Sequence, residues 1–441
     1  MIQGKAMWLK LAFANILVFF TVNLIQAQTW ELQDCIDTAL VNNKRLAISK
    51  NNVLIGEQRS REAKANLIPK LTVNGDYKYY TDLPYQLMPL SIFGGPEGQF
   101  KEAQFGVPHN LNANLQLAVP LYNPQVYGAI EVTKIASELG KIKQQKSAKQ
   151  IYLEISNLYY NTQILRTQLD FIDSNISNSK RLLRNIQLAK SQLLANGTDV
   201  NRVALQLEQL KSKRFRLESK HDQVLNGLKF LMGISIERNL EINSEIQYQS
   251  NSEYERQSTL DLLMAKTHNR LLNSELSTLK RTRLPSVSLF GSYGTIGYGY
   301  DQKPNNFLNF YPIGLAGIQV KYPLFNGMVT QRKIDQKKIE ITNSEIQLTL
   351  VDDQNEMLIE NAKMDRSVAE QLIETNKLQV ELAKSIYENT ELQRQNDFSS
   401  LNDVLMTDIA YREAQQNYLS AIVDYLKADL ELKNITGNIL K

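Results

Sequence analysis

Long stretches of the chain place apolar side chains alternately three and four positions apart. This spacing runs through residues 151–176, stops at residues 196–198, and resumes through residues 200–231. It returns in the second half of the chain over residues 404–435. Side chains at this spacing form the contact seam between the helices of a coiled coil. The pattern therefore predicts long α-helices that fold back on themselves as antiparallel hairpins.

Four shorter segments alternate apolar and polar side chains, as strands with two different faces do. The alternation is clear over residues 71–80 and 110–119, and fainter over 287–293 and 318–322. Such segments are typical of outer-membrane barrel strands, although a half-buried soluble sheet has the same pattern. In a barrel, the amide side chains that share one face of the second segment would line the lumen. They are Asn110, Asn112, Asn114 and Gln116.

The two halves of the chain resemble each other. Val119-Pro-Leu-Tyr-Asn123 returns as Tyr322-Pro-Leu-Phe-Asn326 about 204 residues later, and Asp199-Val200 returns as Asp403-Val404. Each half has the order helix, strand, loop, strand, long helix, turn, helix, with the longer loop in the first half. Self-similarity of this kind indicates an internal duplication.

A secretory signal precedes the repeats. Lys5 and Lys10 come before an apolar run over residues 11–25, and Ala27 offers a small residue for cleavage. This arrangement is typical of a cleaved signal peptide. The chain is then expected to divide into a signal peptide at 1–27, a first repeat at 28–234, an equatorial linker at 235–258 and a second repeat at 259–441.

Each repeat is expected to hold one strand hairpin and one helical hairpin. In the first repeat the strand hairpin covers residues 71–119 and the helical tip lies near 196–199. In the second repeat the strand hairpin covers residues 287–322 and the helical tip lies near 396–401.

Four strands are too few to close a barrel, because the smallest closed barrels have about eight. No segment after the first 27 residues holds 18 consecutive apolar residues, so we expect any membrane insertion to use the strands. Three copies would supply twelve strands, which is the simplest closed assembly. The sequence therefore predicts a homotrimer with one shared β-barrel.

The composition argues against several other classes of protein. The 441 residues include 50 basic and 46 acidic side chains without a basic stripe, so we expect no nucleic-acid partner. One cysteine and three histidines fit no metal-ligand spacing, and we expect no metal and no cofactor. No phosphate-binding loop and no combination of acid, base and nucleophile stands out, so we do not expect an enzyme.

The motifs together resemble a known family. The opening segment Trp30-Glu-Leu-Gln-Asp-Cys-Ile-Asp-Thr-Ala-Leu-Val-Asn-Asn43, the Pro-Leu-Tyr/Phe-Asn motifs at Pro120 and Pro323, and the Asp-Val pairs resemble TolC-like outer-membrane efflux proteins. The resemblance implies an α+β membrane protein: a trimeric twelve-stranded β-barrel in outer-membrane lipid, continuous with a conduit of α-helical hairpins in the periplasm. It implies the outer membrane of a Gram-negative bacterium as the location. It also implies a periplasmic adaptor (membrane fusion) protein and an inner-membrane pump as partners.

The resemblance also assigns roles to the helical tips. Family channels close there through acidic side chains, and the matching residues are Asp199 and Asp403, while Met406 replaces a second acid. Asp near a helix start is also a good cap and dipole partner, so a purely structural role stays open. The tip residues implied to contact the adaptor are Asn196, Gly197, Thr198, Asn396, Asp397 and Ser399.

Two functions fit these patterns. The first is a passive export duct that opens at its periplasmic tip and carries substrates delivered by a pump; drug, metal-ion and protein cargoes are equally compatible with it. The second is a non-conducting coiled-coil tether. A tether has no use for duplicated strands with one polar and one apolar face, so the sequence favours the duct.

Overall fold

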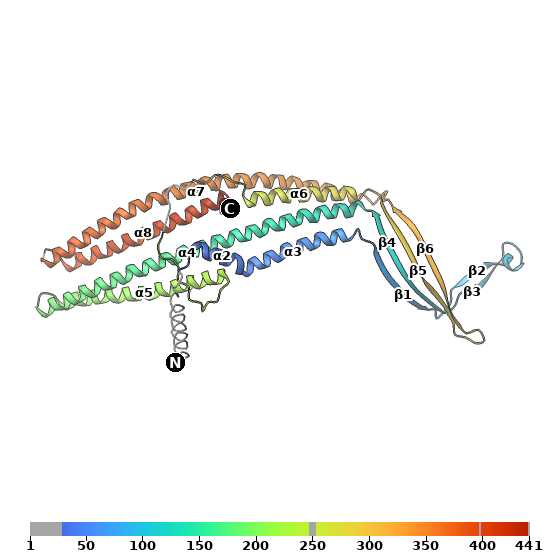
Figure 1. Cartoon of the computed structure of the whole chain (residues 1–441), viewed down its shortest axis with the longest axis horizontal. Helices are drawn as coiled ribbons and strands as arrows, with labels where there is room; N and C mark the ends of the chain where they lie inside the picture. Colours follow the sequence, from blue (N-terminus) through green and yellow to red (C-terminus); the bar gives the residue numbers. More distant parts are fainter. Residues whose placement is uncertain (1–28, 247–252, 397, 440–441) are drawn as a thin grey trace, which may run out of the picture. The chain divides into compact units, whose positions relative to one another are not determined.

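The computed structural model describes residues 29–246, 253–396 and 398–439 (Figure 1). The predicted signal peptide therefore lies outside the described residues, as does part of the predicted linker. The first half of the chain forms α2 (Leu32–Asn42), α3 (Lys44–Ala65), β1 (Lys70–Tyr79), β2 (Tyr85–Pro89), η1 (Leu90–Phe93), β3 (Phe100–Gln104), β4 (His109–Tyr122), α4 (Pro124–Ser191) and α5 (Gly197–Met232). The second half forms α6 (Leu260–Arg281), β5 (Ser286–Tyr300), β6 (Phe307–Lys321), α7 (Val329–Gln395) and α8 (Leu401–Ile435). In both halves a helical segment is followed by two long strands and a long helical hairpin, and the first half adds β2, η1 and β3 between its long strands.

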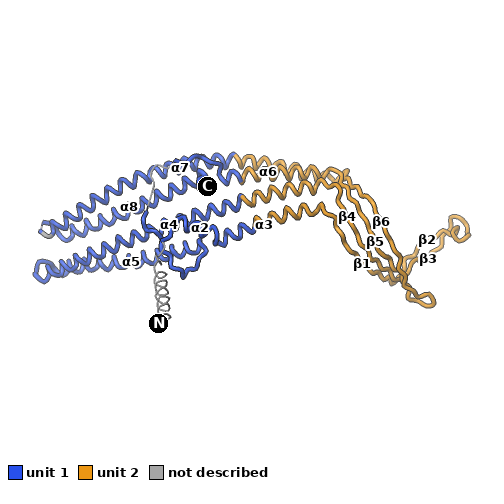
Figure 2. Tube along the Cα trace, in the orientation of Figure 1, with its two compact units in different colours: residues 1–51, 142–263, 349–441 blue, residues 52–141, 264–348 orange. Residues whose placement is uncertain are grey.

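The chain separates into two compact units (Figure 2). The helical unit comprises residues 1–51, 142–263 and 349–441, and the sheet unit comprises residues 52–141 and 264–348. Among the helices of the described residues, none is both long enough and apolar enough to cross a membrane.

The helical unit is held together along the seams of its helices. Leu169, Ile172 and Ile176 of α4 pack against Leu207 and Leu210 of α5, and all five side chains are buried. These are positions of the three-and-four spacing, so the seam forms where the sequence predicts it. Burial of each such side chain stabilises the hairpin by about 1.5–3 kcal/mol.

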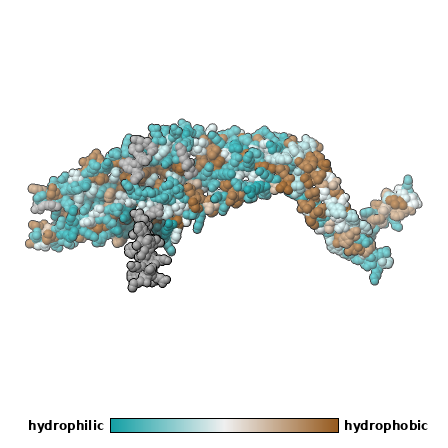
Figure 3. All heavy atoms as spheres, in the orientation of Figure 1, coloured by the Kyte–Doolittle hydropathy of each residue, from teal (hydrophilic) through white to brown (hydrophobic). Residues whose placement is uncertain are grey.

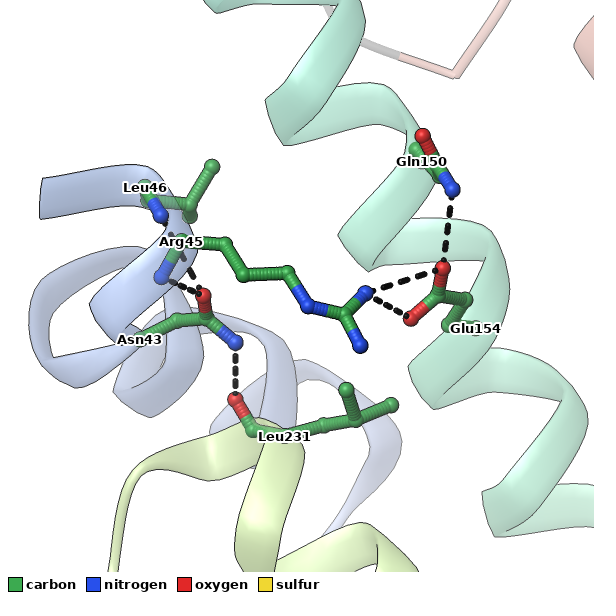
Figure 4. Close-up of polar contacts among 6 residues, drawn as sticks. All are labelled: Asn43, Arg45, Leu46, Gln150, Glu154 and Leu231. Atoms are coloured by element: carbon green, nitrogen blue, oxygen red, sulfur yellow. Dashed lines mark hydrogen bonds and ion pairs between the residues drawn. The ribbon is translucent and has the colours of Figure 1, made fainter. Parts of the chain in front are cut away.

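Asn43 joins three helices with a single side chain (Figure 4). Its Oδ1 accepts hydrogen bonds from the backbone N–H groups of Arg45 (2.8 Å) and Leu46 (3.2 Å), which caps the start of α3. Its Nδ2 donates to the carbonyl of Leu231 in the last turn of α5 at 2.6 Å. Arg45 then reaches α4, where its guanidinium lies 3.0 Å from the Glu154 carboxylate. The break between α2 and α3 is thereby fixed against α4 and α5.

The sheet unit contains a four-stranded antiparallel sheet in the order β1-β4-β5-β6. β4 pairs with β1 through Asn112 opposite Asp76, and with β5 through Asn112 opposite Ile296. The longer first loop forms a separate two-stranded sheet from β2 and β3. β1 and β6 are the sheet edges, and no strand of the described residues pairs with the outer side of either one.

Candidate functional site

The two helical tips of the helical unit are built by side-chain caps. Asn196 precedes α5, and its side chain accepts a hydrogen bond from the backbone N–H of Asp199 at 2.9 Å. Ser400 precedes α8, and its hydroxyl accepts a hydrogen bond from the backbone N–H of Asp403 at 3.2 Å. Both aspartates predicted to line the constriction thus occupy the third helical position, where a cap requires a free backbone N–H.

Asp403 also contributes its carboxylate to this cap. Its Oδ2 accepts hydrogen bonds from the backbone N–H of Ser400 (2.9 Å) and from the hydroxyls of Ser400 (2.7 Å) and Ser399 (3.3 Å). These bonds favour the ionised form, so the pKa of Asp403 lies below its ordinary value. The structural role that the sequence left open for Asp403 is therefore present, and Asp403 is an exposed, ionised carboxylate at the tip.

The remaining tip residues lie at or beside these turns. Gly197 and Thr198 are the first two residues of α5. The Asn396 side chain donates to the Leu392 carbonyl at 3.0 Å, and Ser399 binds Asp403 as described. Asp397 lies outside the described residues. The tips thus bring together Asn196 with Asp199, and Ser399 with Asp403.

Sequence reasoning missed the apolar side chains of both tips. Leu193 is 93% exposed and has a φ of 63°, a backbone conformation that is costly for a bulky residue. Leu194 beside it is also exposed, and Phe398 at the other tip is 85% exposed. Large apolar residues in two short turns were the signal that could have revealed them, since turns otherwise favour Gly, Asn, Asp and Ser.

A buried polar cluster connects the two helical hairpins close to the tips; we call it the tip junction. Asp408 of α8 is only 6% exposed and forms an ion pair with Arg412, one turn further along α8. Gln206 of α5 donates to the Asp408 carboxylate at 2.7 Å, and Arg412 donates to the hydroxyl of Ser179 of α4 at 3.2 Å. The tip junction, comprising Ser179, Gln206, Asp408 and Arg412, therefore ties α8 to both helices of the first hairpin.

Two further contacts cross between the hairpins at this level. The guanidinium of Arg181 of α4 lies 3.3 Å from the carboxylate of Glu391 of α7. Closer to the tips, three buried side chains pack against one another: Ile186 of α4, Val203 of α5 and Leu401 of α8. Burial raises the pKa of Asp408, while Arg412 opposes that shift. Any separation of the two helical hairpins must break the tip junction, the Arg181–Glu391 ion pair and this apolar contact.

One face of the four-stranded sheet carries connected amides over β1 and β4, while Tyr311 and Leu315 of β6 lie on the same face. The side-chain amide of Asn112 donates to the Asp76 carboxylate at 3.1 Å, and the side-chain amide of Asn114 donates to the side-chain oxygen of Asn112 at 3.2 Å. Asn74 bridges Asn114 (3.3 Å) and Gln116 (3.2 Å). Asn110 lies on the same face, where its side chain donates to the Val107 carbonyl. The four residues predicted to line a lumen thus lie in one row.

The opposite face of the sheet is apolar and uncovered. Val73 of β1 is 80% exposed, and Leu115, Tyr293 and Ile318 continue this face across β4, β5 and β6. Figure 3 shows hydrophobic surface over the strands. An exposed apolar face of this extent marks a surface that is covered by a partner or by lipid.

In the residues that the structure describes, no group of three or more His, Cys, Asp or Glu side chains is arranged to hold a metal ion.

Several solved structures share this architecture. No family model matches the sequence, and no curated protein matches it. Among solved structures, the outer membrane protein VceC of Vibrio cholerae matches with a TM-score of 0.73 at 14% identity, over 92% of this chain and 96% of that chain. The open state of the MtrE outer membrane channel of Neisseria gonorrhoeae matches with a TM-score of 0.72 at 16% identity, over 93% and 89%. The chain has the fold of these outer-membrane proteins.

The CmeC outer membrane channel of Campylobacter jejuni matches equally well, with a TM-score of 0.72 at 13% identity over 92% of this chain and 85% of that chain. The predicted α+β fold with helical hairpins and a four-stranded sheet is therefore confirmed. The shared trimeric barrel and the internal duplication stay predictions.

Proposed function

We propose that three copies of this chain form a passive channel in the outer membrane of a Gram-negative bacterium. The observation that carries the proposal is the four-stranded sheet, which has one face that is polar over β1 and β4, an opposite face that is apolar and uncovered, and two edges unpaired among the described residues. Such a sheet is complete only when its edges are paired and its apolar face is in lipid. Its likeness to VceC, MtrE and CmeC supports the same conclusion.

The strand directions are compatible with closure between copies. Because all three pairings are antiparallel, β1 and β6 run in opposite directions. β6 of one copy can therefore pair with β1 of the next in the same antiparallel manner. Three copies give a twelve-stranded barrel in which the amide row of each β4 faces the lumen.

The helical hairpins form the periplasmic conduit of the proposed channel. An adaptor protein joined to an inner-membrane pump binds the tips, where Leu193, Leu194 and Phe398 supply apolar anchors among the polar tip residues. Interface energy concentrates in such anchors. Adaptor binding opens the channel by separating the hairpins, which breaks the tip junction. Cargo is supplied by the pump.

Asp403 combines two roles in this proposal. All of the hydrogen bonds that its carboxylate accepts in the described part of the chain fall on Oδ2, which leaves Oδ1 for the pore. Three copies would ring the constriction with negative charge and favour cations. Asp199 holds the equivalent position on the first hairpin.

Disulfide cross-linking tests whether the barrel closes between copies. Val73→Cys is combined in turn with Ala316→Cys, Ile318→Cys and Val320→Cys, whose side chains share the apolar face. We expect one of these pairs to give a covalent trimer on a non-reducing gel. The matched control is Val73→Cys with Leu315→Cys, which lies on the polar face and should give none. Folded protein that forms no trimer with any same-face pair would contradict closure, and the non-conducting tether would then be favoured.

A further inference from the structure

The helix end of the four-stranded sheet is strongly basic. Segments 61–70, 280–286 and 321–333 surround the ends of β1, β5 and β6, and they contain nine Arg or Lys residues and one acidic residue, Glu62. The whole chain is nearly balanced, with 50 basic and 46 acidic residues. We call these nine cations the basic collar. At the opposite end of the sheet, acidic residues such as Asp82, Glu97, Glu102 and Asp301 accompany the lysines.

Among the described residues, the collar cations have no carboxylate partner in an ion pair. The ion pairs of the sheet unit that connect helices lie further along them, at Glu57–Lys141, Glu138–Arg270 and Glu275–Lys337. In the described parts of the chain, none of the nine collar cations lies within ion-pair distance of a carboxylate. Arg283 instead donates to the neutral amide of Gln331 at 2.6 Å, and Lys70 donates to that of Asn66 at 3.1 Å. These bonds orient the cations without cancelling their charge.

Exposed apolar side chains accompany the collar. Leu324 and Phe325, between β6 and α7, are 85% and 81% exposed. At the equivalent position of the first half, Leu121 and Tyr122 are also exposed. Cations next to exposed aromatic and aliphatic side chains are typical of the boundary between the acyl chains and the headgroups of a membrane.

One part of the collar forms a concave site within the sheet unit. Its walls include Arg283, Leu324, Phe325, Asn326, Thr330 and Gln331. Arg283 has five N–H donors, and a guanidinium matches the geometry of a phosphate. The side-chain amide of Asn326 donates to the hydroxyl of Thr330, which leaves one amide N–H and the hydroxyl proton as further donors, while Leu324 and Phe325 provide an apolar wall. The combination suits a ligand that is both anionic and apolar.

We propose that this pocket binds an anionic phospholipid of the inner leaflet, with its phosphate on Arg283 and its acyl chains along Leu324 and Phe325. Lys321 does not line the pocket, but it pairs with Ser286 at the end of β6 and adds to the positive charge beside it. The proposal rests on the proposed function, because only membrane insertion of the sheet brings the collar to a headgroup layer. The charge of the collar selects the lipid, since anionic headgroups attract clustered Lys and Arg. The first half has Leu67 where the second has Arg283, so each chain has one such site.

Lipid titration of the purified full-length protein in detergent tests this site. Short-chain phosphatidylglycerol and phosphatidylcholine are titrated separately, and bound lipid is counted by native mass spectrometry. We expect phosphatidylglycerol to bind more tightly. Arg283→Gln and Lys321→Gln should each weaken phosphatidylglycerol about five-fold, with little effect on phosphatidylcholine. The matched control, Lys101→Gln on β3, removes the same charge from the separate two-stranded sheet and should change the affinity for neither lipid.

Three results would overturn the site. They are equal affinity for the two lipids, a preference that survives both substitutions, and displacement of the lipid by excess inorganic phosphate, which would assign the pocket to a free anion. Failure of the proposed function is distinguishable, because it would appear as wild-type protein that does not insert into vesicles of any composition. Insertion without a lipid preference contradicts only the lipid site.

Discussion

Single side chains fix where the long helices begin and end, and Asn43 is the clearest example. Asn43→Ala removes the cap of α3 and leaves the Leu231 carbonyl without its partner. We expect a loss of about 1–3 kcal/mol in the free energy of unfolding, measured by denaturant titration. Arg45→Ala is the comparison, because it removes only the partly exposed ion pair with Glu154 and should cost under about 1 kcal/mol. Equal losses for the two variants would contradict the role assigned to Asn43.

The cap at Asp403 predicts how ion selectivity depends on pH. Its hydrogen bonds lower its pKa below the ordinary 3.8, so the carboxylate stays ionised until the pH falls below that value. We therefore expect single-channel cation selectivity to persist as the pH falls from neutral and to fade only at the acidic pH at which Asp403 becomes protonated. Ser400→Ala should move this loss of selectivity to higher pH, and Asp403→Ala should weaken cation selectivity at every pH, with Asp199 supplying the remainder. Selectivity unchanged in Asp403→Ala would exclude Asp403 from the constriction.

The positions of the tip residues could be predicted from the sequence, whereas the pore role of Asp199 and Asp403 stays a prediction. Asp199 and Asp403 could be placed at helix starts because the spacing and the preceding Asn or Ser identify a cap. The exposure of Leu193 and Phe398 could not be predicted, because a seam pattern does not say which apolar residues remain uncovered at a turn.

At the scale of elements, the tip junction is the contact that opening must break. Arg412→Met leaves the buried Asp408 carboxylate without its cation, which typically costs 3–5 kcal/mol. We expect hydrogen exchange to show local opening of α8 made easier by about 3 kcal/mol. The double variant Asp408→Leu with Arg412→Met should recover most of this loss, because no buried charge remains. Full loss in both variants would show that packing, not the ion pair, holds the hairpins.

The stability of the single variant Arg412→Met should depend on pH in a defined direction. Burial raises the folded-state pKa of Asp408 in the wild type, and removal of Arg412 takes away the group that opposes the shift. A carboxyl whose pKa is raised on folding favours the folded state when it is protonated. The penalty in Arg412→Met should therefore be small below the ordinary Asp pKa and should grow as the pH rises through the folded-state pKa. A penalty that does not change with pH would contradict an ionised Asp408.

Most elements could be predicted from the sequence because each carries its own period. The three-and-four spacing predicted the helical hairpins, and the alternation over 110–119 predicted the polar row on β4. The tip junction could not be predicted, since Ser179, Gln206 and Asp408 lie on separate helices. These side chains come into contact only because of the way in which α4, α5 and α8 pack against one another. The sheet β2–β3 was expected only as a longer loop, because its strands are short.

At the scale of the whole molecule, the chain carries features that are incomplete in one copy. Among the described residues, the edges of β1 and β6 are unpaired, the apolar face of the sheet is uncovered, and the cations of the basic collar form no ion pair. A closed trimer in lipid satisfies all three at once. The strand count and the duplication indicated this from the sequence, whereas the collar required the sheet to bring 61–70, 280–286 and 321–333 to one end.

The central claim is that this assembly is a conducting channel whose restriction lies at the helical tips. Single-channel recording in planar bilayers tests it most directly, with wild type and Arg412→Met compared as purified trimers. We predict small cation-selective steps from the wild type and larger or longer-lived steps from Arg412→Met, because its hairpins separate more easily. Trimers that insert into the bilayer but never conduct, in either form, would contradict the channel and support a tether.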